Sequence, residues 1–512
     1  MQNNEYLNIP KEKFEFATQG EKIHDRKLDT KPIGYFKDAW IRFRKNKSSV
    51  VAAGIIVILV LFAIIVPMVS NYTVDDRDGY YSTMLPKNSL FEGTGFWDGT
   101  SVKSMNKTAY LYRKAIGMES GNEVVIGEPT ITKDAEGNES YEVRIDSYNE
   151  VGFIYLNLTE EEYIALQEYQ DENQVQIMYP VPNNYKTNYS IGNDGANFWY
   201  KLKNDQPNST GEPALDANGN YVHNYRTSSS KEAGKYTSQM RLESDTGENG
   251  KWFVYAVKNQ TGYKVRVLYK EYYEYMHGYE AKFLFGTNAY GQDIFTCLAA
   301  GARLSFILAV CVSIINLTIG AIYGAIEGYY GGATDMIMER VSDILSSVPF
   351  MVVVVLFKLH LADEVGILPS LLFAFVLTGW IGMASRVRMQ FYRFKRQEYV
   401  LAARTLGAKD RRIMFKHIFP NALGTIITGS VLVIPGVIFT ESSLSYLGII
   451  NLETSSLTSV GTLLSQGQGY LSTHPHIILF PALFISLLEI AFNLFGNGLR
   501  DAFNPSLRGV EE

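Results

Sequence analysis

The chain has 512 residues, a formal net charge of −6 and a mean hydropathy near zero. These averages hide two populations, because residues 71–285 hold 31 acidic and 21 basic residues and 24 of the 34 tyrosines, whereas the remainder is apolar and slightly basic. The absence of a recurring basic patch on the polar block argues against nucleic-acid binding, and seven dispersed histidines give no support to metal or nucleophilic catalysis.

The N-terminal part predicts a tail and a membrane anchor. Residues 1–34 are polar and are expected to form a cytoplasmic tail. Residues 35–47 combine aromatic and basic side chains, which predicts an amphipathic helix at the lipid headgroups. Residues 48–70 are apolar over the ~20 residues that a spanning helix needs. The preceding cations place the N-terminus in the cytoplasm. The long tail and the missing cleavage site argue against a cleaved signal peptide.

The polar block at 71–285 is expected to be an extracellular α+β domain. It contains no cysteine, so it must fold without disulfides, which is more typical of bacteria with little oxidative folding than of eukaryotic secreted proteins. Runs at 123–132 and 141–145 flank a turn-rich segment and predict a hairpin. Thr159 and Glu162 form a capping-box pattern that starts a helix running to about Tyr169.

The rest of this block gives weaker indications. Residues 251–269 alternate aromatic and β-branched side chains, which predicts strands, and 216–220 predict a turn. The acidic residues at 75–78 resemble a calcium loop, but the intervening arginine and the missing distal acid favour a solvated turn. The tyrosine-rich segment 269–279 predicts either an aromatic surface for a peptide or receptor, or an interface resting on the membrane or a partner.

Five more apolar segments follow, and with the first they predict six transmembrane helices. They cover 304–326, 341–359, 367–384, 423–447 and 477–495 within a core at 286–503. The connection at 386–417 holds ten Lys and Arg residues against two acids. Six spans place this loop, here bounded as 386–420, in the cytoplasm together with the C-terminal tail 504–512, as the charge rule requires.

Three polar residues fall inside the predicted spans: Asn316, Glu441 and Glu489. A charge at membrane depth is costly, so such residues usually face a bundle interior or water. For Glu489 we expect either a position on a cavity or interhelix hydrogen bond, or a protonated carboxyl with a structural partner. The three residues are therefore candidates for the transport pathway or for intramembrane packing.

The cytoplasmic loop carries a short helix. Residues 398–406 are good helix formers spanning roughly 13 Å, and Gly407 is placed to end the helix in a left-handed cap. Ala402 and Ala403 permit close approach of another backbone. The pattern alone leaves two interpretations open, namely an ordinary surface helix on lipid headgroups and a helix presented to a partner.

The loop resembles the coupling-loop signature of ABC importer permeases. That signature has Glu-Ala-Ala, a glycine four residues later and an apolar stretch with proline, here Leu401-Ala402-Ala403, Gly407 and Ile418-Phe419-Pro420-Asn421. Segments at 40–47, 285–295, 301–305, 328–332, 338–344, 441–448 and 492–501 also resemble the oligopeptide, dipeptide and nickel branch, most of all the second permease of an oligopeptide importer.

The resemblance implies a function and a set of partners. The chain would be a non-catalytic permease subunit that takes up oligopeptides, pairs with a homologous permease, and receives substrate from an extracellular peptide-binding lipoprotein in the plasma membrane of a Gram-positive type of bacterium. Two cytoplasmic ATPases would use ATP and magnesium, since the chain has no phosphate-binding loop and binds no cofactor itself. The ATPase-coupling residues would be Glu398, Leu401, Ala402, Ala403, Arg404, Leu406, Gly407 and Pro420.

Several positions depart from the family pattern. Leu401 stands where the signature has its glutamate, Asn288 and Gln292 replace an Asp and an Arg, and Asn497 replaces an Asp. The polar block replaces a short loop. Three alternatives stay open: a membrane-anchored sensor or adhesion protein, a secondary transporter driven by an ion gradient, and a permease for dipeptides or nickel chelates. The role of the polar block is hypothesised to be docking or gating for the receptor.

Overall fold

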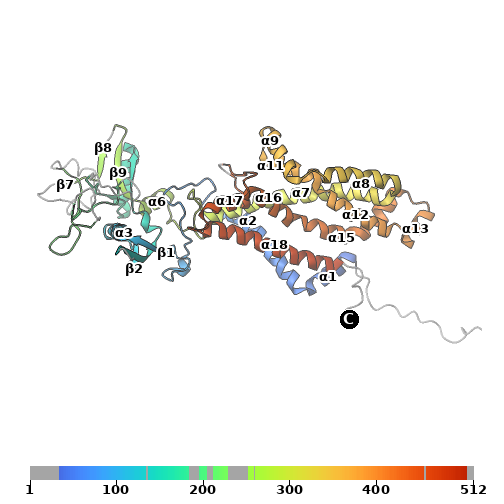
Figure 1. Cartoon of the computed structure of the whole chain (residues 1–512), viewed down its shortest axis with the longest axis horizontal. Helices are drawn as coiled ribbons and strands as arrows, with labels where there is room; N and C mark the ends of the chain where they lie inside the picture. Colours follow the sequence, from blue (N-terminus) through green and yellow to red (C-terminus); the bar gives the residue numbers. More distant parts are fainter. Residues whose placement is uncertain are drawn as a thin grey trace, which may run out of the picture.

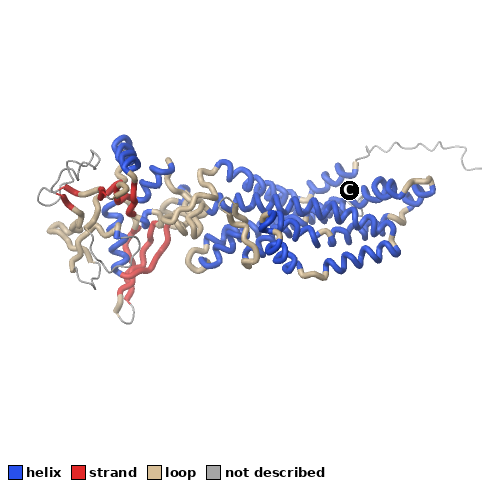
Figure 2. The backbone as a smooth tube through the Cα atoms, turned by 90° about the horizontal axis from the view of Figure 1, so that it is seen from above, coloured by secondary structure: helices blue, strands red, loops and turns tan. Residues whose placement is uncertain are grey.

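The computed structural model describes residues 34–133, 137–183, 195–204, 212–228, 252–258, 260–454 and 457–503. The molecule is elongated, with a helix bundle along one half and an α+β domain at one end (Figure 1). Strands are confined to that domain, as Figure 2 shows. We call the end of the bundle next to the α+β domain the domain end, and the opposite end, which carries α13, the loop end.

The chain enters the bundle through two helices separated by a single residue. Helix α1 (Tyr35–Lys45) ends at Asn46, whose side chain accepts the Ser49 N–H and thereby caps α2 (Lys47–Val69). The buried Phe43 of α1 packs edge-on against Phe495 of α18 (His476–Phe503). A helix is thus present where the amphipathic segment was predicted, and it lies against the last helix of the bundle.

Five helical units are long and apolar enough to cross a membrane: α2, α7 (Ile294–Tyr330), Ile367–Phe394, Asp410–Tyr446 and α18. A sixth consists of α8 (Gly332–Ser346) and α9 (Phe350–His360), which are bent by 70° at a short break. Pro349 explains the break, because proline lacks the N–H of a helix interior and disfavours helical geometry at the residue before it. The fold is a polytopic helical membrane protein with five helices that can span the membrane, or six when this broken pair, which replaces the single helix expected over 341–359, counts as one span.

The remaining helical segments connect or divide these units. They are α10 (Ala362–Val365), α11 (Ile367–Gly379), α12 (Ile381–Phe394), α13 (Glu398–Thr405), α14 (Asp410–Arg412), a π-helical turn (Ile413–Ile418), α15 (Phe419–Val431), α16 (Val433–Tyr446) and α17 (Val460–Gly467) followed by a 3₁₀ turn (Gln468–Tyr470).

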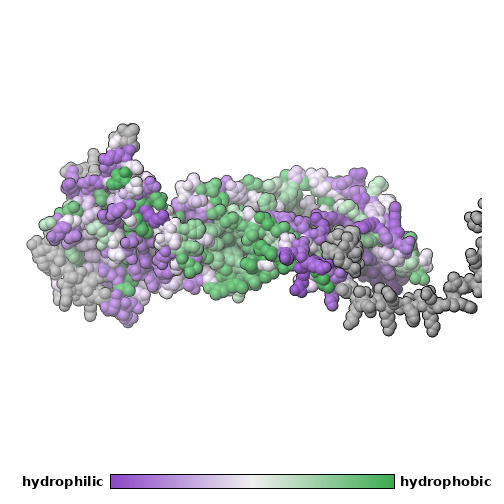
Figure 3. Space-filling view, turned by 90° about the horizontal axis from the view of Figure 1, so that it is seen from below, coloured by the Kyte–Doolittle hydropathy of each residue, from purple (hydrophilic) through white to green (hydrophobic). Residues whose placement is uncertain are grey.

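The outside of the bundle is apolar. Ile58, Ile314 and Leu359 expose between 58% and 66% of their surface, and a band of hydrophobic residues covers the middle of the bundle in Figure 3. Soluble proteins rarely expose contiguous apolar surface on this scale. The band therefore marks the part of the molecule that faces lipid or other membrane subunits.

The α+β domain contains a three-stranded antiparallel sheet in the order β1-β3-β2. Strand β1 (Thr100–Asn106) leads into α3 (Lys107–Ser120), and β2 (Val125–Lys133) pairs with β3 (Glu139–Asp146). This pair confirms the predicted hairpin, although residues 134–136 of its turn lie outside the described residues. The register shifts between Ile126 and Thr130, which indicates a bulge in β2.

A second sheet is centred on β9 (Tyr263–Leu268). It pairs with β4 (Phe153–Leu158) and with β5 (Met178–Tyr179) and β8 (Ala256–Lys258), while β6 (Thr227–Ser228) pairs with β7 (Trp252–Phe253) in a small ladder of its own. These strands confirm the prediction over 251–269.

The helices beside the second sheet follow the predicted signals in part. Both hydrogen bonds of the capping box at Thr159 are present, and α4 (Glu160–Asn173) runs four residues beyond the predicted end. The tyrosine-rich segment forms α6 (Tyr269–His277), in which Tyr269 and Tyr273 are buried in the domain core. The expectation of an open aromatic surface there was wrong for these two side chains, because one face of α6 packs inward.

The domain and the bundle are joined by hydrogen bonds between residues 78–84, before the inserted domain, and residues 287–290, after it. We call this junction the seat. The Asp78 N–H donates to the carbonyl of Tyr290, and the Met84 N–H donates to Thr287 Oγ1. Asp78 Oδ1 also accepts the N–H of Tyr80, so this carboxylate caps a turn as predicted, but it is half-buried rather than solvated because its Oδ2 accepts from the Tyr269 hydroxyl. The domain is therefore held by packed backbone and is not merely tethered.

Candidate functional site

The helix α13 ends as its sequence predicts. Gly407 has φ of +81°, its N–H donates to the Arg404 carbonyl, and the N–H of Ala408 donates to the carbonyl of Ala403. These two bonds form the Schellman arrangement that closes a helix with a left-handed residue. Glycine adopts this conformation without the steric cost that a Cβ brings.

One face of α13 is buried and the other is uncovered. Val400 is fully buried with Ile413 and Ile418 of the π-helical turn. Leu401 and Leu406 lie on the open side with 48% and 88% of their surface exposed. Glu398, Ala402, Arg404 and Pro420 are also exposed, and Ala403 is half-buried. The structure thus gathers the predicted coupling residues in one exposed segment at the loop end (Figure 1).

Tyr329, the penultimate residue of α7, connects this segment to the bundle. Its hydroxyl donates to Asp410 Oδ1 at 2.6 Å and accepts from Arg404 Nη2 at 3.4 Å. Lys395, at the end of α12, donates to the carbonyl of Gly328 at 2.8 Å. The loop segment is therefore bonded to α7 through Arg404 and Asp410, and α12 is bonded to the same end of α7 through Lys395.

A second polar cluster joins α7, α8 and α12. The Arg388 guanidinium contacts Asp335 at 2.6 Å, Glu339 at 2.9 Å and Glu327 at 3.5 Å. The three carboxylates lie close enough together to suggest a cation site. Arg388 donates to Asp335 and Glu339 and lies beside Glu327, so all three carboxylates already share one guanidinium as a structural ion-pair cluster, although one arginine against three acids leaves the cluster net negative.

Sequence reasoning named neither Tyr329 nor Arg388 as a functional residue. The sequence contained one signal for each residue. Glu327, a partner of Arg388, is an isolated acid at the end of an apolar run, and Tyr329 lies in the glycine-rich segment 328–332. What was missing was the pairing across 53 to 81 residues of sequence, which no local pattern encodes.

The polar residues predicted within the spans have three different environments. Glu441 is fully buried and accepts hydrogen bonds from Ser305 of α7 at 3.0 Å and from Ser445 at 3.1 Å, so it connects two spans. Asn316 is buried, and its Oδ1 has no partner among the described residues. Glu489 is half-buried, and within the described part of the chain its carboxylate makes no ion pair or hydrogen bond.

Two positions that depart from the family pattern lie together at the domain end. Asn288 Nδ2 donates to Gln292 Oε1 at 2.8 Å, and both residues are buried. Asn288 also donates to Gln466, which precedes the end of α17. A neutral amide pair thus occupies the place where the resemblance expects an oppositely charged pair, and it spares the fold the desolvation of two charges.

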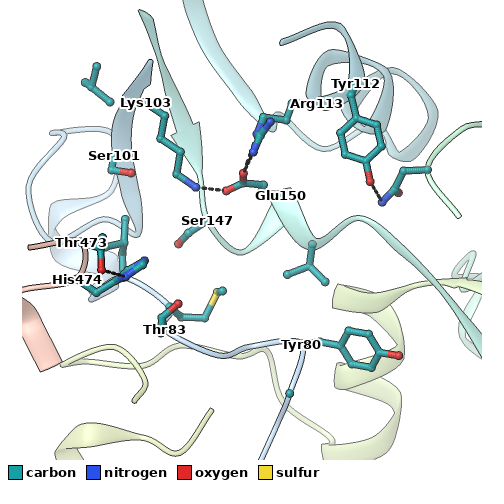
Figure 4. A pocket seen from close by; sticks show the side chains of 16 residues that line it. Tyr80, Thr83, Ser101, Lys103, Tyr112, Arg113, Ser147, Glu150, Thr473 and His474 are labelled. Carbon is teal, nitrogen blue, oxygen red and sulfur yellow. Dashed lines mark hydrogen bonds and ion pairs between the residues drawn. The ribbon is translucent and has the colours of Figure 1, made fainter. Parts of the chain in front are cut away.

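A cavity of about 750 Å³ lies between the α+β domain and the chain before α18. Its wall carries Glu150, which accepts from Lys103 and, at 2.7 Å, from Arg113 (Figure 4). Thr473 and His474 of the bundle line the opposite side in the same view. Burial and the nearby Lys103 lower the pKa of the His474 ring. The volume lies in the range of small-molecule sites, and the cavity sits where the domain meets the bundle.

Comparison with known proteins finds relatives for the bundle. Residues 316–509 match the family described as the binding-protein-dependent transport system inner membrane component, and residues 34–86 match the N-terminal transmembrane domain of oligopeptide transport permease C. The oligopeptide transport system permease protein OppC of Bacillus subtilis is 46% identical over 44% of this chain and 72% of its own length.

Two further similarities were found. The dipeptide transport system permease protein DppC of Bacillus subtilis is 42% identical over 44% of this chain and 69% of its own length. Among solved structures, a chain from inward-facing conformations of the MetNI methionine ABC transporter aligns with 41% of this chain and 96% of its own length, at 14% identity and a TM-score of 0.33.

Proposed function

Because the chain belongs to the family of oligopeptide and dipeptide ABC transport permeases, it is a permease subunit of a peptide importer. We propose that it takes part in the import of oligopeptides and is driven by two ATPases, one of which docks on α13 and the other on the equivalent helix of a homologous permease. The observation that carries the docking proposal is the exposed apolar face of this helix. Leu401 and Leu406 are largely uncovered, yet α13 is capped at Gly407 and anchored through Val400.

The proposed mechanism is mechanical. An apolar groove on one ATPase covers Leu401 and Leu406, and acidic residues around the groove pair with Arg404 and nearby cations. The second ATPase docks on the equivalent helix of the homologous permease. Nucleotide-driven closure of the ATPases moves α13 as a rigid body, and the Tyr329 and Lys395 contacts pass that movement to α7 and α12. ATP and magnesium act in the partner subunits, and this chain supplies no catalytic group.

The surroundings of the subunit follow from this proposal. A homologous permease completes the translocation pathway in a bacterial plasma membrane. Of the three intramembrane polar residues, the half-buried Glu489 is the one that would face this pathway, whereas Asn316 and Glu441 are buried inside the bundle and pack the spans together. Both termini and the loop end are cytoplasmic, and the α+β domain is extracellular, since the loop at 386–420 carries the excess of cations. A Gram-positive type of cell fits a domain that folds without disulfides.

The α+β domain is proposed to dock or gate an extracellular peptide-binding lipoprotein. It stands at the end opposite α13, and its cavity reaches the chain before α18 (Figure 1, Figure 4). Replacing 100–268 with a short linker should abolish receptor-dependent uptake while the spans still assemble. Unchanged uptake and unchanged receptor affinity would contradict this role and leave the coupling proposal untouched.

The coupling proposal is tested with Leu401→Ser and Leu406→Ser in the purified complex. Each leucine that a partner buries contributes about 1.5–3 kcal/mol, so the affinity of the ATPases for the permease should fall at least about tenfold per substitution. Leu471→Ser is the matched control, because Leu471 is 58% exposed at the domain end. Equal affinities in all three variants would rule out docking on this face.

Gly407→Pro provides an independent test of the same proposal. Proline cannot adopt φ of +81° and has no N–H to donate to the Arg404 carbonyl, so the end of α13 must rearrange. We expect assembly of the spans to persist while ATP hydrolysis no longer drives uptake. Retained ATP-driven uptake would contradict the coupling role, and uptake that follows an ion gradient instead would favour a secondary transporter.

A further inference from the structure

A small cavity near the loop end is lined by three arginines from two helices. It has a volume of about 290 Å³ and lies between α12, α15 and α18. Arg386 and Arg393 come from α12 and Arg500 comes from α18. The floor is formed by Gly424, Thr425, Thr428, Gly429, Leu432 and Phe503. No carboxylate is among these lining residues.

The three guanidinium groups lack counter-ions within the described part of the chain. Arg386 donates only to the carbonyl of Gly429, at 3.2 Å, and Arg393 lies beside the ring of Phe394. Neither these two nor Arg500 forms an ion pair among the described residues. Arg388, on the same helix, is the internal contrast, because it contacts three carboxylates. The fold therefore compensates one arginine of α12 and leaves its neighbours facing a cavity.

The three arginines are exposed, and their convergence on one cavity without a carboxylate in its lining favours an anionic ligand. Guanidinium groups present planar pairs of donors that match the oxygens of a phosphate. The backbone supports this arrangement, because a Cβ at Gly429 would lie 2.9 Å from Arg386 Nη1 and would displace that side chain. The cavity has room for a phosphate group but is small for a peptide.

We propose that this cavity binds the phosphate of an anionic phospholipid headgroup. Met389 lies between Arg386 and Arg393 at helical spacing on α12 and is 57% exposed, so it offers apolar surface to an acyl chain beside the charged groups. Basic pockets between transmembrane helices at a membrane surface are suited to such headgroups. The lipid would hold α12, α15 and α18 together next to α13.

The test uses the full chain, purified in mild detergent and supplied with phosphatidylglycerol, phosphatidylcholine or inorganic phosphate. Native mass spectrometry counts retained lipids, and thermal unfolding reports stabilisation. Phosphatidylglycerol should be retained and should raise Tm more than phosphatidylcholine. Replacing Arg386, Arg393 and Arg500 by Gln should weaken its retention about fivefold per arginine. Lys at the same positions should restore only part of it, because lysine keeps the charge but lacks the paired donors.

Arg340→Gln is the control, because Arg340 is exposed on α8 and its partner Asp343 is also exposed. It should leave retention of phosphatidylglycerol unchanged. Stabilisation by inorganic phosphate without retained lipid would assign the cavity to a free phosphate and overturn the lipid source. Equal retention in the wild type and the triple Gln variant would overturn the proposal itself.

Discussion

The helix bundle and the α+β domain differ in which side chains they bury and which they expose. The bundle leaves large apolar residues such as Ile58 and Leu359 on its outside and keeps polar groups such as Glu441 inside. The domain buries tyrosines in two cores, and its fully buried arginine, Arg266, forms an ion pair with Glu119. The bundle therefore leaves apolar surface uncovered, whereas the described part of the domain has two buried cores of its own.

This difference predicts where each region is fragile. In the bundle, single polar contacts such as those of Tyr329 set the relative positions of helices. In the domain, stability depends on the satisfaction of groups that water cannot reach. Substitutions that remove a buried partner should thus act on one region only, unless the seat between the two regions transmits them.

The largest effect is expected at the buried pair of Arg266 and Glu119. Arg266 is completely buried and donates to Glu119 and to the carbonyls of Ala196 and Pro180. Glu119→Gln leaves an uncompensated buried cation, which should cost about 3–5 kcal/mol of unfolding free energy. Tryptophan fluorescence of the full chain during urea unfolding measures the loss, because Trp199 lies in a core of this domain.

Two companion variants make that result interpretable. Glu128→Gln removes an exposed acid from the same domain and should change stability by less than about 0.5 kcal/mol. A double variant with Glu119→Leu and Arg266→Met should recover most of the loss, because it removes the charge along with its partner. If the Glu119→Gln variant also loses ATPase binding, the domain and the bundle are not independent, which would contradict the prediction that such a substitution acts on one region only.

A smaller effect, dependent on pH, is expected at Asp293, which caps α7 at the boundary between the regions. Its Oδ2 accepts from Thr296, whereas its Oδ1 is buried without a partner among the described residues. Burial raises the pKa of this carboxyl to about 6 from an ordinary value of 3.8. The folded state then binds more protons than the unfolded state between these values, so stability should fall as pH rises through this window.

A shift of that size corresponds to about 3 kcal/mol at neutral pH. Asp293→Asn keeps a capping oxygen and removes the charge, so it should raise Tm at pH 7.5 and flatten the decline between pH 4 and pH 6.5. Thermal unfolding across this range measures both. A variant with the same pH profile as the wild type would show that the buried charge is compensated by a group outside the described residues.

The contrast between the regions also explains what the sequence could predict. Spans, the loop helix and the cap at Gly407 follow from composition and local geometry, since apolar length and a glycine after a helix carry physical meaning by themselves. The capping box at Thr159 and the hairpin of β2 and β3 are local for the same reason.

Features that depend on distant contacts could not be predicted in this way. The sequence predicted one span over 341–359, which includes Pro349. The 70° bend at this proline depends on how α9 packs on α11. The environment of Glu441, and the convergence of Arg386, Arg393 and Arg500 on one cavity, require the positions of separate helices. The inward face of α6 depends likewise on the second sheet, because the same tyrosines suit a core and a surface.

The smallest effect is expected at Thr159. A substitution there tests whether the two cores of the domain unfold as one cooperative unit. Its hydroxyl caps α4, whose Tyr163 stacks on Tyr263 of β9 in the core that also reaches the seat at Met84. Thr159→Ala should cost about 1 kcal/mol, and Thr130→Ala, at an exposed position of β2, should cost less than about 0.5 kcal/mol. If Thr159→Ala lowers the urea concentration at which both sheets unfold, the two cores form one cooperative unit. If it lowers that concentration for the second sheet alone, the sheets unfold separately, and the seat at Met84 is stabilised by the core that α4 caps.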